Sequence, residues 1–312
     1  MRQAIDRTVR QLTVEGLDDK NKDRARLYIS NHRDIILDSA ILNVALFEAG
    51  FGTIETAIGN NLLSDELVAD LTKLNKNFVV KRNTGAREFY ENSMLLSAYI
   101  RDTIVNRGSG VWIAQREGRT KDGMDKTQPG LLKMLGMKCE DSLRQCFREL
   151  KVTPVAISYE YDPCDVLKIP ELKAISREEK YQKAPNEDFR SILTGIIGDK
   201  GRVHLKVGKT LDEELEALAD FPSQNDKLRV LGEIIDKQIF THYKLWPTNY
   251  IALDLAEGTN AYRDFYTDEE RRYFEDRMAE RLAKADLNEE EDRRMLLNMY
   301  ANPVKNVQSV LL

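Results

Sequence analysis

The chain has 312 residues, of which 42% are hydrophobic and 32% are charged, and its formal net charge is -5. This is enough apolar sequence for one large domain, or for a core domain with an appendage. Acidic and basic residues nearly balance, which excludes the global basic field of nucleic-acid-binding proteins, so any phosphate site must be local.

The three cysteines, Cys139, Cys146 and Cys164, stand at no metal-ligand spacing. Cys139 and Cys146 are seven residues apart, as on one helix face, and we expect reduced thiols in a cytoplasmic protein. The first sixteen residues lack the apolar stretch of a secretory signal. The best candidate for a membrane span, Ile35–Phe47, is too short and contains Asp38, so no spanning segment is expected.

The first part of the chain alternates short apolar runs with helical stretches. A strand is predicted at 25–30 (ARLYIS), followed by a helix over 35–49 that Gly50 closes. A second helix is predicted over 64–75, and after it come a strand at 77–82 (NFVVKR) and a long helix over 86–108.

The same alternation continues to residue 161. A strand is predicted at 110–115 (GVWIAQ), then a polar loop over 116–130, a helix over 140–150 and a strand at 152–161 (VTPVAISYEY). Short strands rich in Val and Ile and separated by helices predict an α/β domain with a mixed, largely parallel sheet flanked by helices.

The composition of the chain changes at about Ile169. The segments that follow are charge-rich and helical in pattern, with one alternating strand candidate between them at 201–208 (GRVHLKVG). Beyond Leu211 the pattern is helical throughout. We therefore place a boundary near Thr210, which separates a domain at 1–209 from a helical C-terminal region at 210–312 packed on the core.

Three polar groups follow predicted strands of the first domain. They are residues 31–34 (NHRD) together with Asp38, residues 81–82 (KR), and residues 116–121 (REGRTK). The carboxyl ends of parallel strands face one crevice, so we expect the three groups to converge. Taken singly, each group also has a structural explanation: a satisfied histidine, an N-cap at Asp34, a solvated strand end and a turn.

Together the groups resemble the motifs of the glycerolipid acyltransferase family. The first motif of that family is a histidine followed at a short distance by an aspartate, here His32 and Asp38 with one residue more between them than the family has. The second is an apolar strand that ends in basic residues (FVVKR), the third is EGRTKDG, and the fourth is VTPVAISYE. The resemblance covers Tyr28 to Asp165 and leans towards the glycerol-3-phosphate acyltransferase branch.

The resemblance implies acyl transfer from a thioester to an alcohol, with His32 as the general base. A neutral imidazole can accept the hydroxyl proton, and a carboxylate on its other nitrogen fixes the tautomer and stabilises the imidazolium. Asp38 is the first choice for this carboxylate and Asp34 the reserve. The substrate hydroxyl attacks directly, so no covalent intermediate is implied.

The acceptor implied by the resemblance carries a phosphate, which guanidinium groups bind as a fork. We expect Arg82 and Arg119 to bind it and Lys81 and Lys121 to add positive potential. The resemblance also places residues at the polyol and at the acyl donor: Glu117 and Gly118 for the former, where Gly118 permits close backbone approach, and Pro154 for the latter.

The expected substrates are glycerol 3-phosphate or a lysophospholipid as acceptor, and acyl-CoA or acyl carrier protein as thioester donor and co-substrate. No bound cofactor, metal or nucleic acid is expected, and His204 and His242 are interpreted as structural. Because the product is amphiphilic, we expect a cytoplasmic protein associated peripherally with the inner face of the membrane.

Two other classes of function fit part of the pattern. The HRD triplet at 32–34 also opens the catalytic loop of protein kinases, but Ser39 stands where that loop needs asparagine, and no glycine-rich loop precedes it. A non-catalytic protein that binds lipid head groups or a membrane surface on the same fold needs only the basic residues. It would not need His32 with an aspartate at the same turn.

Overall fold

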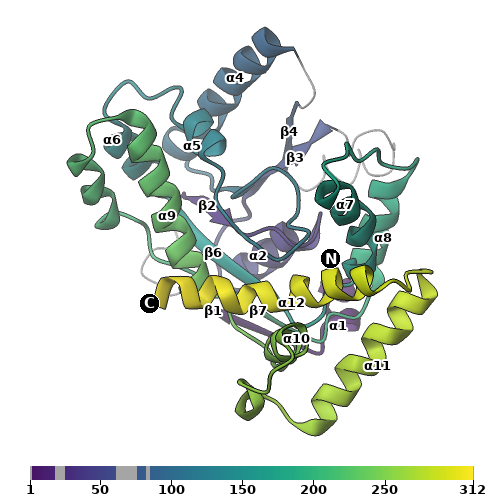
Figure 1. Ribbon diagram of the computed structural model, residues 1–312. Helices are drawn as coiled ribbons and strands as arrows, with labels where there is room; N and C mark the ends of the chain where they lie inside the picture. The colour runs from purple at the N-terminus through teal and green to yellow at the C-terminus, as the bar shows by residue number, and fades with distance from the viewer. Residues whose placement is uncertain (1, 18–24, 61–75, 82–84, 312) are drawn as a thin grey trace.

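The computed structural model describes residues 2–17, 25–60, 76–81 and 85–311 (Figure 1). At its centre lies a seven-stranded sheet with the strand order β1-β7-β6-β2-β5-β3-β4. Neighbouring strands are parallel except for β6 and β7, which are antiparallel. The predicted α/β fold with a mixed, largely parallel sheet is confirmed.

Five of the seven strands lie where the sequence predicts them. The strands are β1 (Gln11–Glu15), β2 (Leu27–Ser30), β3 (Glu55–Gly59), β4 (Asn77–Val80), β5 (Val111–Ala114), β6 (Thr153–Tyr159) and β7 (Arg202–Val207). The sequence did not predict β1 and β3. The first is a largely exposed edge strand and the second, ETAIG, has little apolar character, so neither shows the alternation or apolar run that predicts a strand.

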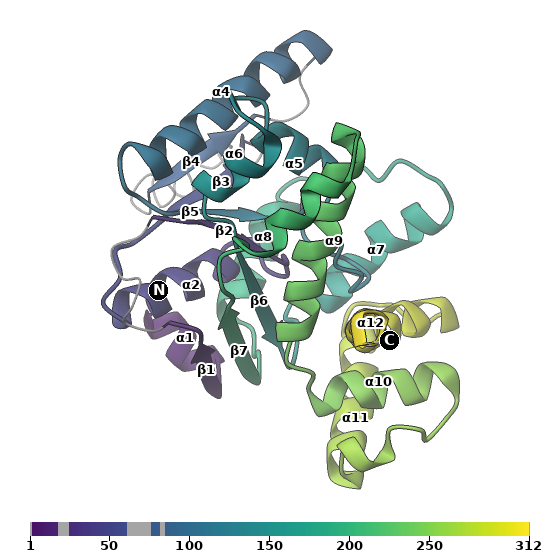
Figure 2. The ribbon, with the colours of Figure 1, turned by 90° about the vertical axis from the view of Figure 1, so that its left-hand side faces the viewer.

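Helices cover both faces of the sheet (Figure 2). Side chains such as Leu27 and Ile29 pack against helices α4 (Ala86–Val105), α5 (Pro129–Leu135), α6 (Leu143–Glu149) and α9 (Gln224–His242) and the 3-10 helix η3 (Glu214–Asp220). On the opposite face, Tyr28 and Trp112 pack with residues of α1 (Arg2–Thr8) and α2 (Leu37–Glu48). The helix predicted over 64–75 lies outside the described residues.

A third apolar cluster joins the later helices. It contains Ile169 of α7 (Asp165–Ser176) and residues of α10 (Pro247–Glu257), α11 (Asp268–Lys284) and α12 (Glu290–Leu311). Helix α8 (Glu187–Ile197) and the 3-10 helix η4 (Arg263–Phe265) complete the described elements. The helical C-terminal pattern is thus confirmed. The domain boundary near Thr210 remains a prediction. The elements η3 and α9, which follow Thr210 in the chain, pack against the core of the sheet.

Cys139 and Cys146 form a disulfide, so the expectation of three reduced thiols is wrong. Cys139 does not share a helix with Cys146, as its spacing suggested, but precedes α6, and the chain folds back so that the two Cα atoms lie 5.6 Å apart. Cys164 is free and buried. No helix within the described ranges is both long enough and apolar enough to cross a membrane.

Candidate active site

The first motif lies in a short turn between β2 and α2. The backbone leaves the sheet after Ser30, and the side chain of the buried Asn31 continues the pairing with β6. Its Nδ2 donates to the Ile157 carbonyl at 2.8 Å, and its Oδ1 accepts from the Ile157 N–H at 2.9 Å. This amide bridge fixes the chain at the residue before His32.

His32 and Asp38 form a hydrogen-bonded pair. The distance from His32 Nδ1 to Asp38 Oδ2 is 2.8 Å, and the side chain of His32 is 13% exposed while that of Asp38 is 1% exposed. Asp38 Oδ2 also accepts from the N–H groups of Arg33 and Asp34 at 2.7 and 3.0 Å, and Oδ1 accepts from Tyr159 Oη at 2.8 Å. The contact expected between His32 and Asp38 is therefore present, with three further donors that hold the carboxylate in place.

Asp34 has a different set of partners. Its Oδ1 accepts from the N–H groups of Ile36 and Leu37 at 3.0 and 2.8 Å, at the first turn of α2. Asp34 thus accepts from the first N–H group of the helix, but the N-cap residue is Ile36, so the prediction of Asp34 as the N-cap of a helix that starts at Ile35 is wrong. Residues 34–36 form a turn, and Asp38 follows it in the first turn of α2.

The pKa of Asp34 is raised, mainly by burial and next by the negative charge of Asp38. The capped N–H groups and the charge of Arg119 act in the opposite direction. The pKa of Tyr159 is also raised, by its burial and by the neighbouring carboxylates, so its hydroxyl remains protonated and donates to Asp38. Sequence reasoning did not identify Tyr159 as part of the site.

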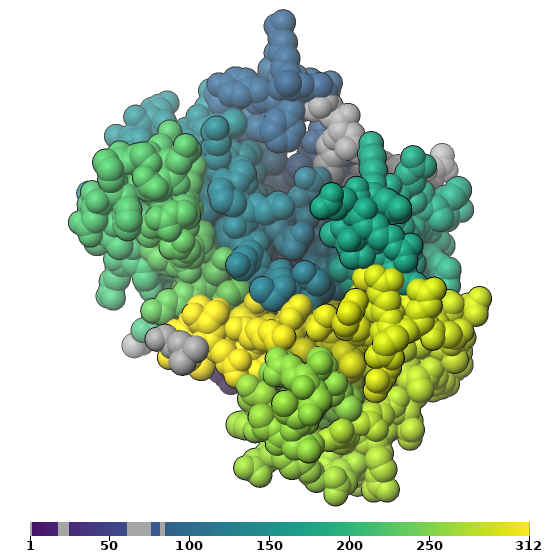
Figure 3. All heavy atoms as spheres, in the orientation of Figure 1, coloured from purple at the N-terminus to yellow at the C-terminus, as the bar shows by residue number. Residues whose placement is uncertain are grey.

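The ring of His32 packs edge to face on Trp112, with 5.6 Å between ring centroids. Trp112 is fixed in turn by a hydrogen bond from its Nε1 to Ser30 Oγ at 2.9 Å. Since Nδ1 donates to Asp38, the second ring nitrogen, Nε2, can accept a proton, and it forms no hydrogen bond with a described residue. The surface is hollowed between α9 and α7 (Figure 3).

The third motif belongs to a loop that we call the third-motif loop, residues 116–127. A hydrogen bond from the Gln128 N–H to the Gln115 carbonyl, 2.9 Å long, closes its base. The Thr120 N–H donates to the His32 carbonyl, also at 2.9 Å, so the loop lies directly against the first motif. The structure therefore brings the first and third motifs together, as the sequence predicted.

Two cations of this loop, Arg119 and Lys121, are largely buried. Arg119 is 8% exposed, and its Nη1 has no hydrogen-bond partner among the described residues. Lys121 Nζ lies 2.7 Å from Glu171 Oε2 of α7. The pKa of Lys121 is lowered, first by burial and then by the charge of Arg119, while Glu171 opposes the shift.

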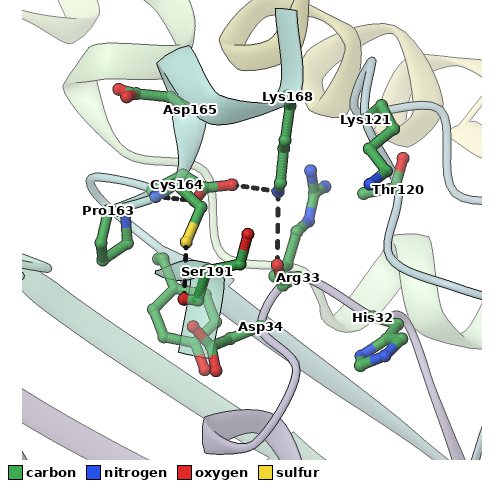
Figure 4. Close-up of polar contacts among 12 residues, drawn as sticks. His32, Arg33, Asp34, Thr120, Lys121, Pro163, Cys164, Asp165, Lys168 and Ser191 are labelled. Atoms are coloured by element: carbon green, nitrogen blue, oxygen red, sulfur yellow. Dashed lines mark hydrogen bonds and ion pairs between the residues drawn. The ribbon is translucent and has the colours of Figure 1, made fainter. Parts of the chain in front are cut away.

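Behind the turn lies a buried ionic network that the sequence did not predict. Arg33 Nη2 is 2.5 Å from Asp125 Oδ2, and both side chains are buried. Lys168 of α7 donates to the Arg33 carbonyl at 3.3 Å (Figure 4). It also pairs with Asp162. Burial raises the pKa of Asp125 although Arg33 opposes the shift. Through the hydrogen bond from Lys168 to the Arg33 carbonyl, the network holds the backbone of the residue that follows His32.

Two of the remaining predicted residues, Lys81 and Pro154, do not lie beside His32. Lys81 is exposed and follows β4, which lies three strands from β2, about 14 Å at the usual strand spacing. Arg82 lies outside the described residues. Pro154 is buried within β6 opposite Ile29, below the level of the turn. The substrate-binding roles given to these three residues stay predictions.

Glu117 and Gly118 lie at the exposed end of the third-motif loop. The Glu117 N–H donates to Gln128 Oε1 at 2.7 Å. Gly118 has a φ of +71°, and a Cβ there would meet nothing within 4 Å. Within the chain, the left-handed backbone conformation, and not close approach of a neighbour, accounts for this glycine.

The other two histidines lie away from this site. His204 of β7 is hydrogen-bonded through Nδ1 to Thr13 Oγ1 at 2.7 Å, and His242 lies beside Gly208. Burial lowers the pKa of both. In the described part of the chain no group of three histidine, cysteine or acidic side chains could hold a metal ion.

The arrangement suits proton transfer beside an anion site. A histidine with a fixed tautomer and a buried carboxylate can remove a proton from a hydroxyl group, and the carboxylate then stabilises the imidazolium. Arg119 and Lys121 supply positive charge from the neighbouring loop. Every residue of this arrangement lies after a parallel strand of the sheet, at the edge where α/β folds bind their substrates.

Residues 11–158, a little under half of the chain, match the family model described as Acyltransferase. No curated protein matches the sequence. Among solved structures, the chain is similar to the crystal structure of the 1-acyl-sn-glycerophosphate (LPA) acyltransferase PlsC from Thermotoga maritima. Identity is 13% and the TM-score is 0.39, over 73% of this chain and 71% of that one, so residue roles are not carried between the two.

The matched segment contains the His32 turn, the third-motif loop and most of β6. These are the parts whose sequence resembles the acyltransferase motifs, and the structure joins two of them by the hydrogen bond between Thr120 and His32. The acyltransferase family match therefore covers the part of the chain in which the structure brings these motifs together.

Proposed function

We propose that the protein transfers a fatty acyl group from a thioester donor to a hydroxyl group of a phosphorylated glycerol acceptor. The observation that supports this most directly is the 2.8 Å contact between His32 Nδ1 and the buried Asp38 carboxylate. A protein that only binds head groups has no need for a histidine whose tautomer is fixed in this way, so we favour the enzyme over the binding protein.

In the proposed reaction the acceptor hydroxyl lies at His32 Nε2, which takes its proton as the oxygen attacks the acyl carbonyl. A carbon–oxygen bond forms, the carbon–sulfur bond of the thioester breaks, and the proton on His32 passes to the departing thiolate. Asp38 stabilises the imidazolium between the two transfers. Arg119 and Lys121 hold the phosphate of the acceptor, glycerol 3-phosphate or a lysophospholipid.

The assay that tests this offers glycerol 3-phosphate and lysophosphatidate in competition to the purified protein, with acyl-CoA and with acyl carrier protein as donors. Mass spectrometry of the products identifies the acceptor and the donor together. His32→Ala is expected to abolish transfer and to leave the circular dichroism spectrum unchanged. An active His32→Ala protein would exclude His32 as the base, whereas an unfolded one would make the residue structural.

We further propose that the protein works at the inner face of the cytoplasmic membrane, where an amphiphilic product would be released. Sedimentation of cell membranes is expected to carry the protein down at low salt and to release it at high salt or in mild detergent. Recovery only in a carbonate-resistant fraction would contradict peripheral association.

A further inference from the structure

The C-terminal helix α12 lies against the third-motif loop, although it lies outside the segment that matches the family model. In Figure 3 it runs across the face of the molecule in contact with the part of the chain that contains this loop. Asn302 Nδ2 donates to the Asp122 carbonyl at 2.7 Å, and Asn306 Nδ2 donates to the Gly123 carbonyl at 2.9 Å. Two amides one helical turn apart thus bind two successive carbonyls of the loop.

The contact is close enough to restrict which residue the loop can have there. Gly123 has a φ of +82°, and a Cβ at this position would lie 2.5 Å from the Met299 carbonyl oxygen. Pro303, one turn further along, has no N–H to donate to that carbonyl, and its ring lies 3.3 Å from the same Cβ position. Backbone therefore packs on backbone, and Asn306 is only 5% exposed.

The helix is itself anchored to the core. Tyr300 Oη donates to Asp165 Oδ2 at 2.9 Å and accepts from the Asp162 N–H at 3.0 Å. From α10, Asn249 Nδ2 donates to the Tyr300 carbonyl at 2.8 Å. A loop tied to α12 is consequently tied to α7 and to the C-terminal cluster.

We infer that Asn302 and Asn306 are positioning residues for acceptor binding. They hold residues 122–123, and through them the segment from Arg119 to Lys121, at the distance from His32 that a phosphorylated acceptor requires. The inference deepens the proposed function and rests on it for the role of Arg119 and Lys121. It gives the C-terminal helix a role in substrate recognition that the family-matched segment cannot supply alone.

The test replaces the buried amide by the isosteric carboxylate, Asn306→Asp, which cannot donate to the Gly123 carbonyl. The matched control is Gln308→Glu on the same helix, which loses an amide donor to Tyr262 Oη and does not contact the loop. Hydrogen exchange of the amides of residues 117–124 is measured by mass spectrometry without substrate. Asn306→Asp is expected to accelerate this exchange roughly tenfold, the scale of one lost buried hydrogen bond, and Gln308→Glu is expected to leave it unchanged.

Steady-state kinetics then separate positioning from general damage. In Asn306→Asp the KM for the phosphorylated acceptor is expected to rise roughly tenfold, while the KM for the donor and kcat change less than about threefold. Asn302→Ala, at a less buried position, is expected to have the same pattern with a smaller effect and serves if Asn306→Asp does not fold. Unchanged exchange and unchanged acceptor KM would overturn the inference, as would equal changes in Gln308→Glu. If the wild-type protein lacks transfer activity, the proposed function fails, whereas the exchange experiment still decides whether α12 holds the loop.

Discussion

Replacement of Asp38 by asparagine removes the charge of the carboxylate and keeps its shape. Oδ2 accepts from His32 Nδ1 and also from two backbone N–H groups, those of Arg33 and Asp34, which cannot turn away. The amide oxygen of the asparagine should therefore occupy this position, with its NH2 group towards Tyr159, whose hydroxyl can rotate to accept. His32 then keeps its proton on Nδ1 and loses only the adjacent negative charge.

The geometry sets the size of the expected effect. An adjacent opposite charge shifts a proton equilibrium by about 1 to 3 pKa units, and each unit is about tenfold in rate. We therefore expect Asp38→Asn to lower kcat by about 10 to 1,000-fold, less than the roughly 10,000-fold loss seen where the wrong tautomer forms. Asp38→Ala should cost more, since it also leaves two buried N–H groups unpaired, each worth about 1 to 3 kcal/mol of stability.

The assay compares kcat and the free energy of unfolding in urea for Asp38→Asn and for Asp34→Asn as its matched control. Asp34→Asn makes the same chemical change four residues away and keeps an oxygen to cap Ile36 and Leu37. It is expected to change neither rate nor stability by much. A wild-type kcat in Asp38→Asn, or an equal loss in Asp34→Asn, would refute the assignment of Asp38 as the orienting carboxylate.

The pairing of His32 with Asp38 could be predicted because both lie within one short stretch of chain. An aspartate on an apolar helix face needs a partner, and His32 was the nearest candidate. The predicted start of α2 at Ile35 was wrong by two residues, because Asp34 accepts from the N–H groups of Ile36 and Leu37 within a turn. Capping residues mark a helix start only to within a turn, so this error follows from the local chemistry.

Partners that come from distant segments could not be predicted. Tyr159, Asp125 and the asparagines of α12 reach the site only through the order of the strands and the packing of the later helices, which no local pattern encodes. The same limitation applies to Lys81. Its strand was predicted and has the expected direction, but its place at the edge of the sheet separates it from β2 by two other strands.

The remaining predictions concern the anion site and pH. Arg119→Ala is expected to lower kcat/KM for the acceptor by a factor that corresponds to about 2 to 4 kcal/mol of transition-state stabilisation, with little change in the KM for the donor. An effect on the donor alone would reassign Arg119 to the phosphates of the donor. Asp236 accepts from the N–H and Oγ1 of Thr127 at 2.8 and 2.6 Å, and its pKa is raised from 3.8 to about 6, chiefly by burial. A raised pKa means that the folded protein binds more protons than the unfolded chain between about pH 4 and 6, so this group lowers the stability as the pH rises through that range. Asp236→Asn keeps the acceptor oxygen and cannot ionise. The free energy of unfolding of Asp236→Asn minus that of wild type should therefore increase by up to about 3 kcal/mol from pH 4 to pH 7. A difference that does not vary with pH would show that Asp236 does not cause the loss of stability over this range.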